Sequence, residues 1–443
     1  MAEKIKIKKG LDIPLKGKPS NVLTEDNVTK NYAIYPDDFP GPVWKAAVKA
    51  GDKVKIGSPL FSDKDNQDLC LVSPVEGTVF EVTRGERRHI NFISIESESR
   101  SYATTLDFKF ENAEEIKTGL MKSGLWAMMR QRPYDIVPDP SVSPRDIFIT
   151  AFDTAPLAGD ILDAELAPWL EKGVEALKKL TTGKVYLGIK PDQKISCKSA
   201  HTTEFEGPHP AGNVGTQIAA LKPVNKGETV WALDAATVAR IGLLIEKKTL
   251  DVHTTVALTG PEIKDPHLVK TIIGASIKSL LESNLVRETG IRIISGNVLT
   301  GVKVSSEGYI RYPYRQITVI PEGDNADEFM GWASINPNKY SVKHSFPAFL
   351  KGLSKPFDFD ARIKGGRRAM IMSGEYDKVF PFDIYPEYLI KAIMAGDIDR
   401  MEKLGIYEVA PEDFALPEFV DTSKQELQQT VREGLDYLRK ELS

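Results

Sequence analysis

The sequence predicts a multidomain α/β protein, for three reasons. At 443 residues the chain is too long for one ordinary core, and about 150 residues per domain suggests roughly three domains. Its 41% hydrophobic and 27% charged content is that of a globular protein, which excludes a disordered, collagen-like or coiled-coil chain. Strand-like patterns give way to alternating strands and helices, and then to helices. We therefore expect segments at 1–103, 104–255, 256–330 and 331–443.

The first segment, 1–103, has the pattern of short β-strands separated by turns. The stretches VKAGDKVKIGSPLF (48–61) and SPVEGTVFEV (73–82) alternate β-branched and polar residues around Gly-Asp and Pro-x-x-Gly turns. They resemble the β-sandwich of biotinyl and lipoyl carrier domains. Lys64 would be the modified lysine, but it follows Leu60 too early for the symmetric hairpin tip that such lysines occupy. We expect the sandwich without a covalently bound prosthetic group.

The second segment, 104–255, alternates strands and helices. Its expected elements are strands at 147–150, 184–189 and 229–233 and helical regions at 161–180 and 234–247. Pro168 should break or restart the first helix, and Asp234 is placed to cap the second. This alternation predicts a parallel, Rossmann-like sheet. No GxGxxG opens a helix, so the dinucleotide fingerprint is absent.

The third segment, 256–330, predicts a compact α+β module. A strand at 253–260 and a helix around 272–285 precede the strand-like stretches ISGNVLTGVKV and GYIRYPYRQITVIPEG. The module resembles a β-grasp domain of the soluble-ligand-binding kind.

The last segment, 331–443, is predicted to be mainly helical. Helices in PEYLIKAIMAGDIDRMEKLG should break near Gly396 and stop at Gly405. Ser423 and Glu426 have capping-box spacing at the start of the last helix. That helix carries an apolar stripe, which is either core packing or a docking face: Leu427, Val431, Leu435, Leu438 and Leu442.

Charge and composition exclude several classes of function. Lys plus Arg number 58 against 62 Asp plus Glu, a net charge of −4, so no overall field attracts nucleic acid. The longest stretch without a charged residue, 207–221, is too short to span a bilayer, and the N-terminus lacks the apolar core of a signal peptide, so we expect a cytoplasmic location. Basic clusters in the first 20 residues and at 362–368 are either solvated loops or contacts with an acidic partner or an anionic membrane.

The cysteines and histidines give little support for a metal or cluster. Cys70 and Cys197 are too few for a four-cysteine iron–sulfur cluster or a disulfide framework. Cys197, His201 and His209 form a possible soft-metal trio, but no fourth ligand accompanies them. We expect no metal site and find no nucleophile motif of the GxSxG kind.

Seven unusual stretches then carry a resemblance that extends over essentially the full chain. They are GLDIPLKGKP (10–19), VKAGDKVKIGSPLF (48–61), GLWAMMRQRPYDIVP (124–138), FITAFDTAPLA (148–158), EGPHPAGNVGTQI (206–218), RIISGNVLTG (292–301) and YDKVFPFDIYP (376–386). In this order they resemble the NqrA family, the A-subunits of sodium-translocating NADH:quinone oxidoreductases. The family is similar in turn to RnfC and to the flavin-bearing NADH subunit of complex I.

The resemblance implies a peripheral subunit on the cytoplasmic side of the inner membrane. Its partners would be the other subunits of a complex that oxidises NADH, reduces quinone and exports sodium, and its contact with the membrane would be indirect. Its own role would be structural and quinone-associated. The alternatives are a scaffold without any ligand and a stand-alone flavin NADH dehydrogenase.

Differences from these relatives argue against a redox group bound by this chain itself. Where they have a glycine-rich flavin loop, this chain has KSGLWAMMR (122–130), whose bulky side chains prevent close backbone approach to a phosphate. The four-cysteine motifs are absent, and Asp421 stands where the family commonly has cysteine. We expect neither FMN nor an iron–sulfur cluster.

Two loops are the candidate quinone pocket. The loop at 206–215 is shaped by glycines and prolines and is either a structural connection without a ligand or a ligand-binding loop at the carboxyl edge of the sheet. The stretch 126–130 is either a filled flavin site or an apolar wall for a quinone ring. The candidate residues are Trp126, Met128, Met129, Arg130, His209, Gly212, Asn213 and Gly215. We expect Arg130, His209 and Asn213 to donate hydrogen bonds to quinone carbonyls, and no residue to be catalytic.

Overall fold

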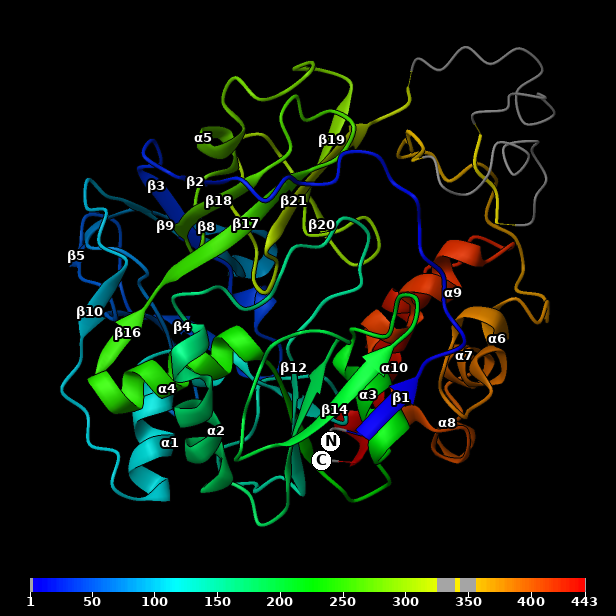
Figure 1. Ribbon diagram of the computed structural model, residues 1–443, viewed down its shortest axis with the longest axis horizontal. Helices are drawn as coiled ribbons and strands as arrows, with labels where there is room; N and C mark the ends of the chain where they lie inside the picture. The colour runs from blue at the N-terminus through cyan, green and yellow to red at the C-terminus, as the bar shows by residue number, and fades with distance from the viewer. Residues whose placement is uncertain (1–2, 325–338, 343–355, 443) are drawn as a thin grey trace.

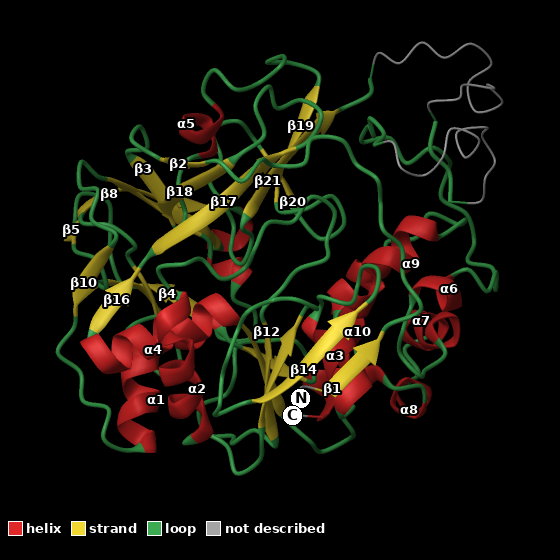
Figure 2. Ribbon diagram, viewed as in Figure 1, coloured by secondary structure: helices red, strands yellow, loops and turns green. Residues whose placement is uncertain are grey.

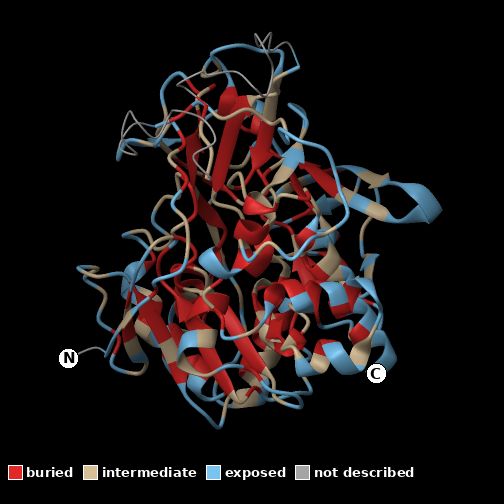
Figure 3. Cartoon of the chain, turned by 90° about the vertical axis from the view of Figure 1, so that its right-hand side faces the viewer, coloured by how far each residue is buried: buried red, intermediate tan, exposed pale blue. Residues whose placement is uncertain are grey.

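The computed structural model describes residues 3–324, 339–342 and 356–442 (Figure 1). These residues form three sheet-based parts and a group of helices near the C-terminus. The largest hydrophobic cluster includes Tyr32, Ile147 and Ile317, which come from three different sheets. Buried residues accordingly run continuously from one sheet to the next (Figure 3).

The N-terminal sandwich consists of two antiparallel sheets. One has the strand order β3 (Asn31–Ile34), β9 (Ile90–Glu96), β8 (Gly77–Arg84) and β5 (Lys53–Val54), and the other β4 (Trp44–Ala46), β6 (Pro59–Asp63) and β7 (Cys70–Val72). Leu60 and Phe61 of one sheet share a core with Ile93 of the other. Lys64 directly follows β6 and is exposed.

A six-stranded sheet forms the second part. Its order is β1 (Glu3–Lys6), β14 (His201–Glu206), β13 (Val185–Ile189), β12 (Asp146–Thr150), β15 (Val230–Asp234) and β11 (Arg130–Arg132). The first five strands are parallel, and β11 is antiparallel to β15. The three predicted strands β12, β13 and β15 and their parallel arrangement are confirmed.

Helices cover both faces of this sheet (Figure 2). They are α1 (Ala113–Lys122), α2 (Leu170–Lys178), α3 (Val214–Leu221) and α4 (Ala235–Lys247). Ile147 and Ile149 of β12 belong to the cluster that contains α2 and α4, whereas Phe148 packs with Ile218 of α3. Because both faces are buried, the strands are continuous apolar runs.

The second segment contains one confirmed cap and one wrong helix boundary. Asp234 caps α4 as predicted, since its side chain accepts a hydrogen bond from the Thr237 N–H at 2.8 Å. The helical region predicted at 161–180 is too long, because only a 3₁₀ turn, η4 (Ala167–Trp169), precedes α2. Pro168 lies in the first turn of η4, where its missing N–H is tolerated.

The third part is a mixed sheet. Its order is β2 (Leu23–Glu25), β18 (Leu268–Ile272), β17 (His253–Thr259), β21 (Gln316–Pro321), β19 (Ile291–Ser295) and β20 (Val302–Val304). The helix predicted at 272–285 is wrong in length, because α5 comprises only Ile277–Leu281. Gly274 has φ +79° and a Cβ there would lie 2.3 Å from the Ala33 carbonyl oxygen, so the chain turns before α5 begins. A separate two-stranded ladder pairs β10 (Ala103–Thr105) with β16 (Thr249–Asp251).

From Pro386 onward the chain is mainly helical, as predicted, whereas 356–375 contains no helix and 331–338 and 343–355 of the predicted segment lie outside the described residues. The helices of this segment are α6 (Tyr376–Val379), α7 (Pro386–Met394), α8 (Ile398–Lys403), α9 (Ala415–Val420) and α10 (Leu427–Leu442). Gly396 and Gly405 end α7 and α8 with positive φ angles of 66° and 90°. None of the helices in the described part of the chain is long and apolar enough to cross a membrane.

The capping box predicted for the last helix is wrong. The α-helix α10 begins only at Leu427, and the Ser423 hydroxyl donates to the Ala369 carbonyl at 3.1 Å. Lys424, which lies between Ser423 and Leu427, has a φ of 56°, and this left-handed backbone conformation interrupts a helix there. The apolar stripe of α10 is core packing, because Leu427, Val431, Leu435 and Leu438 are fully buried; Leu442 is exposed.

The first 25 residues join parts that lie far away in the sequence. Strand β1 pairs with β14, Leu15 forms a bridge with Phe357, and β2 pairs with β18. This segment runs from β2 along the outside of the molecule to β1 (Figure 1). The N-terminal segment thus contacts several parts of the molecule, and the domain boundaries expected from the sequence remain predictions.

Candidate functional site

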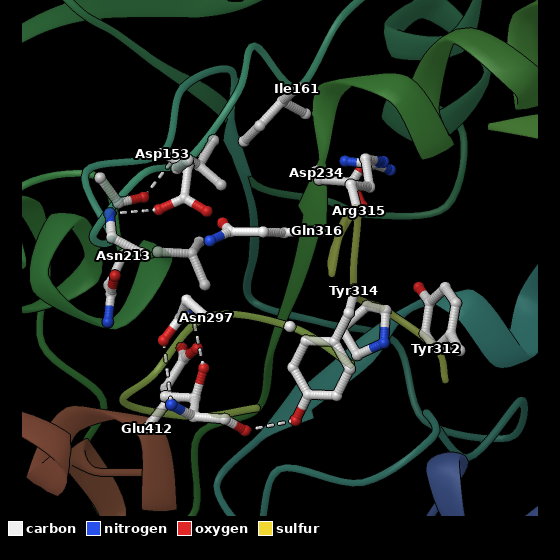
Figure 4. A pocket seen from close by; sticks show the side chains of 18 of the residues that line it. Asp153, Ile161, Asn213, Asp234, Asn297, Tyr312, Tyr314, Arg315, Gln316 and Glu412 are labelled. Carbon is white, nitrogen blue, oxygen red and sulfur yellow. Dashed lines mark hydrogen bonds and ion pairs between the residues drawn. The ribbon is translucent and has the colours of Figure 1, made fainter. Parts of the chain in front are cut away.

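A cavity of about 780 Å³ lies where the three parts and the C-terminal helices meet. Its base is the carboxyl edge of the parallel sheet, with residues that follow β12 and β14 and the last residues of β15. Its walls come from residues 311–315 and the first residue of β21, Gln316, from Asn297 after β19, and from Glu412 in the 3₁₀ turn η8 (Pro411–Phe414) (Figure 4). Open α/β sheets bind ligands at this edge.

The loop 207–213 connects β14 to α3 and brings three candidate residues to the cavity: His209, Gly212 and Asn213. A Cβ on Gly212 would lie 2.7 Å from the Thr154 backbone nitrogen, so only glycine lets the loops after β12 and β14 approach so closely. Asn213 precedes α3, but its side chain makes no capping bond. Its amide lies beside the cavity and is available to a ligand (Figure 4).

His209 is held as a neutral ring. It is 3% exposed, and burial lowers its pKa to about 4. Its Nδ1 lies 3.1 Å from Thr154 Oγ1, and that oxygen accepts the Gly212 N–H at 3.0 Å. The Thr154 hydroxyl proton is thus free to bond Nδ1, which favours the tautomer with its proton on Nε2.

Arg130 and Met128 also line the cavity. The Arg130 guanidinium donates to the carbonyl oxygens of Ala127, Met129 and Asp38 at 2.7–3.1 Å, and it lies 5.5 Å from the centre of the Tyr312 ring. Three of its five N–H groups are therefore used by the backbone. Arg130 fixes the wall of the cavity through these three bonds.

Three candidate residues do not line the cavity: Trp126, Met129 and Gly215. Trp126 and Met129 are fully buried, and the Trp126 indole donates to the Pro138 carbonyl at 2.8 Å. The 3₁₀ turn η3 (Trp126–Met128) turns Trp126 toward Trp231 in the core and leaves Met128 at the cavity. Gly215 packs on Asp413, where a Cβ would lie 2.3 Å from Oδ1.

Apart from Arg130, the charged residues of the cavity were not named as candidates from the sequence. Arg311 is paired with Asp38 at 2.6 Å, and Arg315 with Asp234 at 2.8 Å. Asp153 follows β12 and is accessible from the cavity; its Oδ1 accepts the Ala155 N–H at 2.7 Å. Burial within the molecule raises the pKa of Asp153, although two backbone N–H groups and Arg315 oppose the shift. Its place directly after a predicted strand was the available signal.

Glu412 closes the opposite wall. It accepts a hydrogen bond from Arg132 at 3.0 Å, and burial together with the neighbouring Asp413 raises its pKa. No sequence pattern marks Glu412, because it lies about 280 residues from Arg132.

The chain matches three family models: the NqrA N-terminal barrel-sandwich hybrid domain at 5–98, the NqrA second alpha/beta domain at 111–250 and the NQRA C-terminal domain at 255–306. It is 36% identical to the A-subunit of the Na(+)-translocating NADH-quinone reductase of Pasteurella multocida and 37% identical to that of Vibrio anguillarum, in each case over 99% of this chain and 100% of the relative. The chain belongs to the NqrA family. A crystal structure of an NAD+-reducing [NiFe]-hydrogenase aligns with TM-score 0.37 and 12% identity over 73% of this chain and 63% of the other.

The possible metal trio of this NqrA-family chain is dispersed. Cys197 lies beside Glu171, and burial together with this carboxylate raises the pKa of its thiol to about 12. His201 is exposed beside Tyr186, and the His209 ring forms a hydrogen bond with Thr154. Among the described residues, no group of three or more His, Cys, Asp or Glu side chains is placed to hold a metal ion.

Trp126 should matter for stability and not for ligand binding. We expect Trp126→Phe to lower the free energy of unfolding by about 2 kcal/mol, because the Pro138 carbonyl loses its buried donor and a small void opens beside Trp231. Urea unfolding measures the loss. A selective loss of quinone binding at unchanged stability would instead place Trp126 at the ligand.

Proposed function

We propose that this NqrA-family chain is the peripheral NqrA subunit of a sodium-translocating NADH:quinone oxidoreductase and that its central cavity holds a quinone ring. Its relatives are named as A-subunits of the Na(+)-translocating NADH-quinone reductase. In this assignment the chain lies on the cytoplasmic side of the membrane and reaches it through the other subunits. It contributes no flavin or iron–sulfur cluster, so electrons pass through other subunits or a bound quinone.

The observation that carries the quinone assignment is the mixture of groups around the cavity. A volume of about 780 Å³ suits a small organic ligand. Tyr312 and Met128 supply apolar and aromatic surface, while Asn213, His209 and Arg130 supply donors. Quinone carbonyls only accept hydrogen bonds, so donors beside apolar and aromatic surface suit their recognition.

The surroundings of 122–130 support a quinone over a flavin. In this segment only Gly124 has the positive φ, at 79°, that favours glycine, and a Cβ there would already lie 3.0 Å from Val72. Trp126 and Met129 are packed into the core behind the cavity wall. This backbone offers no row of glycines to surround a flavin phosphate, which disfavours a stand-alone flavin dehydrogenase.

The finer fold assignments belong to the same proposal. We infer that the parallel sheet is Rossmann-like and that the mixed sheet with α5 is a β-grasp module. The first family match ends at residue 98 and the second begins at 111, close to the predicted boundary between 103 and 104. The third match begins at 255, close to the predicted boundary between 255 and 256.

Asn213→Ala tests the quinone assignment. We expect this variant to bind a benzoquinone that lacks an isoprenoid tail several-fold more weakly, because one hydrogen bond contributes about 1 kcal/mol. Binding is measured by calorimetry on the whole chain. Asn27→Ala, at an exposed asparagine away from the cavity, is the matched control. Absence of saturable quinone binding by the unmodified chain would favour the scaffold alternative.

A further inference from the structure

A basic and apolar segment, 363–372, lies at the surface before α6 and belongs to no helix or strand. All of the residues 363–369 are exposed. The middle of the segment is held beside the start of α10, because the Ser423 carbonyl oxygen accepts the Arg368 N–H at 2.9 Å. We call 363–372 together with 424–426 the basic loop surface.

The basic loop surface is strongly positive, although the whole chain is not. Its four basic side chains are Lys364, Arg367, Arg368 and Lys424. Glu426 is its one carboxylate, so its net charge is +3, whereas the whole chain carries −4. Lys424 lies beside the loop, since a Cβ on Gly365 would be 3.5 Å from Lys424 Cε. Asp360, just outside this surface, lies 3.5 Å from Lys364, but its charge is balanced by Arg362 at 2.6 Å.

Three large apolar side chains accompany these charges and face solvent. Ile363 is 62% exposed, Ile371 58% and Met372 43%. Because a chain extends by at most about 3.6 Å per residue, the Cα atom of Ile371 lies within about 11 Å of that of Arg368. A Cβ on Gly366 would meet nothing within 4 Å, so the loop is open to solvent there as well. Positive and apolar side chains thus share one small exposed area.

An anionic lipid bilayer complements both properties of this surface. Each Lys or Arg side chain close to such a bilayer raises affinity about fivefold, and apolar side chains bury themselves between the headgroups. A bilayer demands no matching shape, which suits a loop without helix or strand. Single-stranded nucleic acid is a poorer fit, because 363–372 contains no aromatic side chain on which bases stack.

We propose that the basic loop surface binds anionic lipid at the membrane, with Ile363 and Ile371 inserted between the headgroups. This contact is direct and adds to the attachment through the other subunits. The inference goes beyond the proposed quinone function, because no residue of this surface lines the central cavity.

The test measures binding of the whole chain to lipid vesicles by flotation. Vesicles of phosphatidylcholine with phosphatidylglycerol should bind the unmodified chain at least about tenfold more tightly than vesicles of phosphatidylcholine alone. Raising the salt concentration from about 0.1 M to about 1 M should weaken this binding, because the screening length falls from about 10 Å to about 3 Å.

A charge variant and a matched control locate the binding surface. The charge variant combines Lys364→Gln, Arg368→Gln and Lys424→Gln. It removes three positive charges and should bind the anionic vesicles at least about tenfold more weakly. The control combines Lys49→Gln, Lys53→Gln and Lys55→Gln, at exposed lysines of the N-terminal sandwich. It changes the net charge of the chain equally and should keep its affinity within about twofold. Circular dichroism verifies that both variants are folded.

A second variant, Ile363→Ser with Ile371→Ser, tests the apolar contribution. It keeps every charge and should bind the anionic vesicles at least about fivefold more weakly, because less apolar surface is buried in the bilayer. Unchanged binding of this variant would show that no side chain is inserted and would overturn the proposal.

Three other results would also overturn it. They are absence of binding to the anionic vesicles, an equal loss in the lysine control, and binding to polyglutamate as tight as to the vesicles. The last result would assign the surface to an acidic protein partner. None of them affects the quinone assignment, which calorimetry of Asn213→Ala tests separately.

Discussion

Arg132→Leu should lower the free energy of unfolding by about 3–5 kcal/mol, the loss typical of a broken buried ion pair. Arg132 is 1% exposed, and its two terminal nitrogens contact Asp413 at 2.8 Å and Glu412 at 3.0 Å. Asp413 is itself buried and accepts the Ala410 N–H. Leucine would leave the Asp413 carboxylate without a cation in the interior, where an unpaired charge is costly.

Urea unfolding of three variants separates the charge from the shape of Arg132. Arg132→Lys retains a positive charge but not two parallel donors, so its loss should be intermediate. The double variant Arg132→Leu with Asp413→Leu should lose less than the single variant, because no carboxylate remains unpaired at position 413. Arg367→Leu, whose partner Glu426 is exposed, should change stability by less than about 1 kcal/mol. An Arg132→Leu chain as stable as the unmodified one would contradict the role of this ion pair.

Raising the pH should remove a second large contribution to stability, from His253. This ring is 1% exposed and lies between two carboxylates, with Nδ1 2.8 Å from Asp251 and Nε2 2.9 Å from Asp163. Burial alone would lower its pKa, but the hydrogen bonds to Asp163 and Asp251 outweigh burial and raise the pKa to about 9. The ordinary value of about 6.5 applies to the unfolded chain.

The sign of the effect follows from this raised pKa. The charged ring stabilises the fold fully below about pH 6.5, and this contribution is lost as the pH rises through about 9. At about 1.4 kcal/mol per pKa unit, the rise of the pKa from about 6.5 to about 9 corresponds to about 3.5 kcal/mol, and we expect most of it to be lost between pH 6.5 and 9. The free energy difference between the unmodified chain and His253→Gln should therefore shrink between pH 6.5 and 9.

Control measurements isolate His253 from other titrating groups. The comparison of the two chains at each pH cancels groups common to both, including Cys197, whose raised pKa begins to lower stability where the unfolded thiol ionises, at about pH 8.5. His201→Gln carries the same substitution at an exposed site and should show a smaller dependence on pH. A difference for His253→Gln that stays constant up to pH 9 would show that the ring is uncharged.

Local signals in the sequence were enough to predict many of the helices and strands of the second segment (104–255) and the fourth segment (331–443). Strands β12, β13 and β15 are apolar runs because both faces of their sheet are buried, and Asp234 caps α4 through a bond to a residue three positions away. Gly396 and Gly405 end helices through their own backbone angles. Such features depend on neighbours in the sequence, so a linear reading can find them.

Features set by distant contacts were not predictable. The sequence pattern does not say that η3 turns Trp126 into the core and Met128 toward the cavity, since both are apolar. Ser423 has the spacing of a helix cap but bonds Ala369, which is more than 50 residues away. The walls of the cavity combine Asp153, Tyr312 and Glu412 from three separate regions of the chain. Only the tertiary arrangement brings these together.

The pairing of the first strand has a consequence for biosynthesis. Strand β1 is synthesised about 200 residues before its partner, because Glu3 pairs with Thr203, and Leu23 of β2 likewise pairs with the distant Leu268. At roughly 5–20 residues per second, β1 waits on the order of 10–40 s for its partner. During that time its hydrogen-bonding edge is open to pairing with other chains, so this segment is exposed to mispairing until β14 is made. In a fragment expressed without the first 25 residues, β14 and β18 would lack their partners β1 and β2, so each would have a permanently open hydrogen-bonding edge.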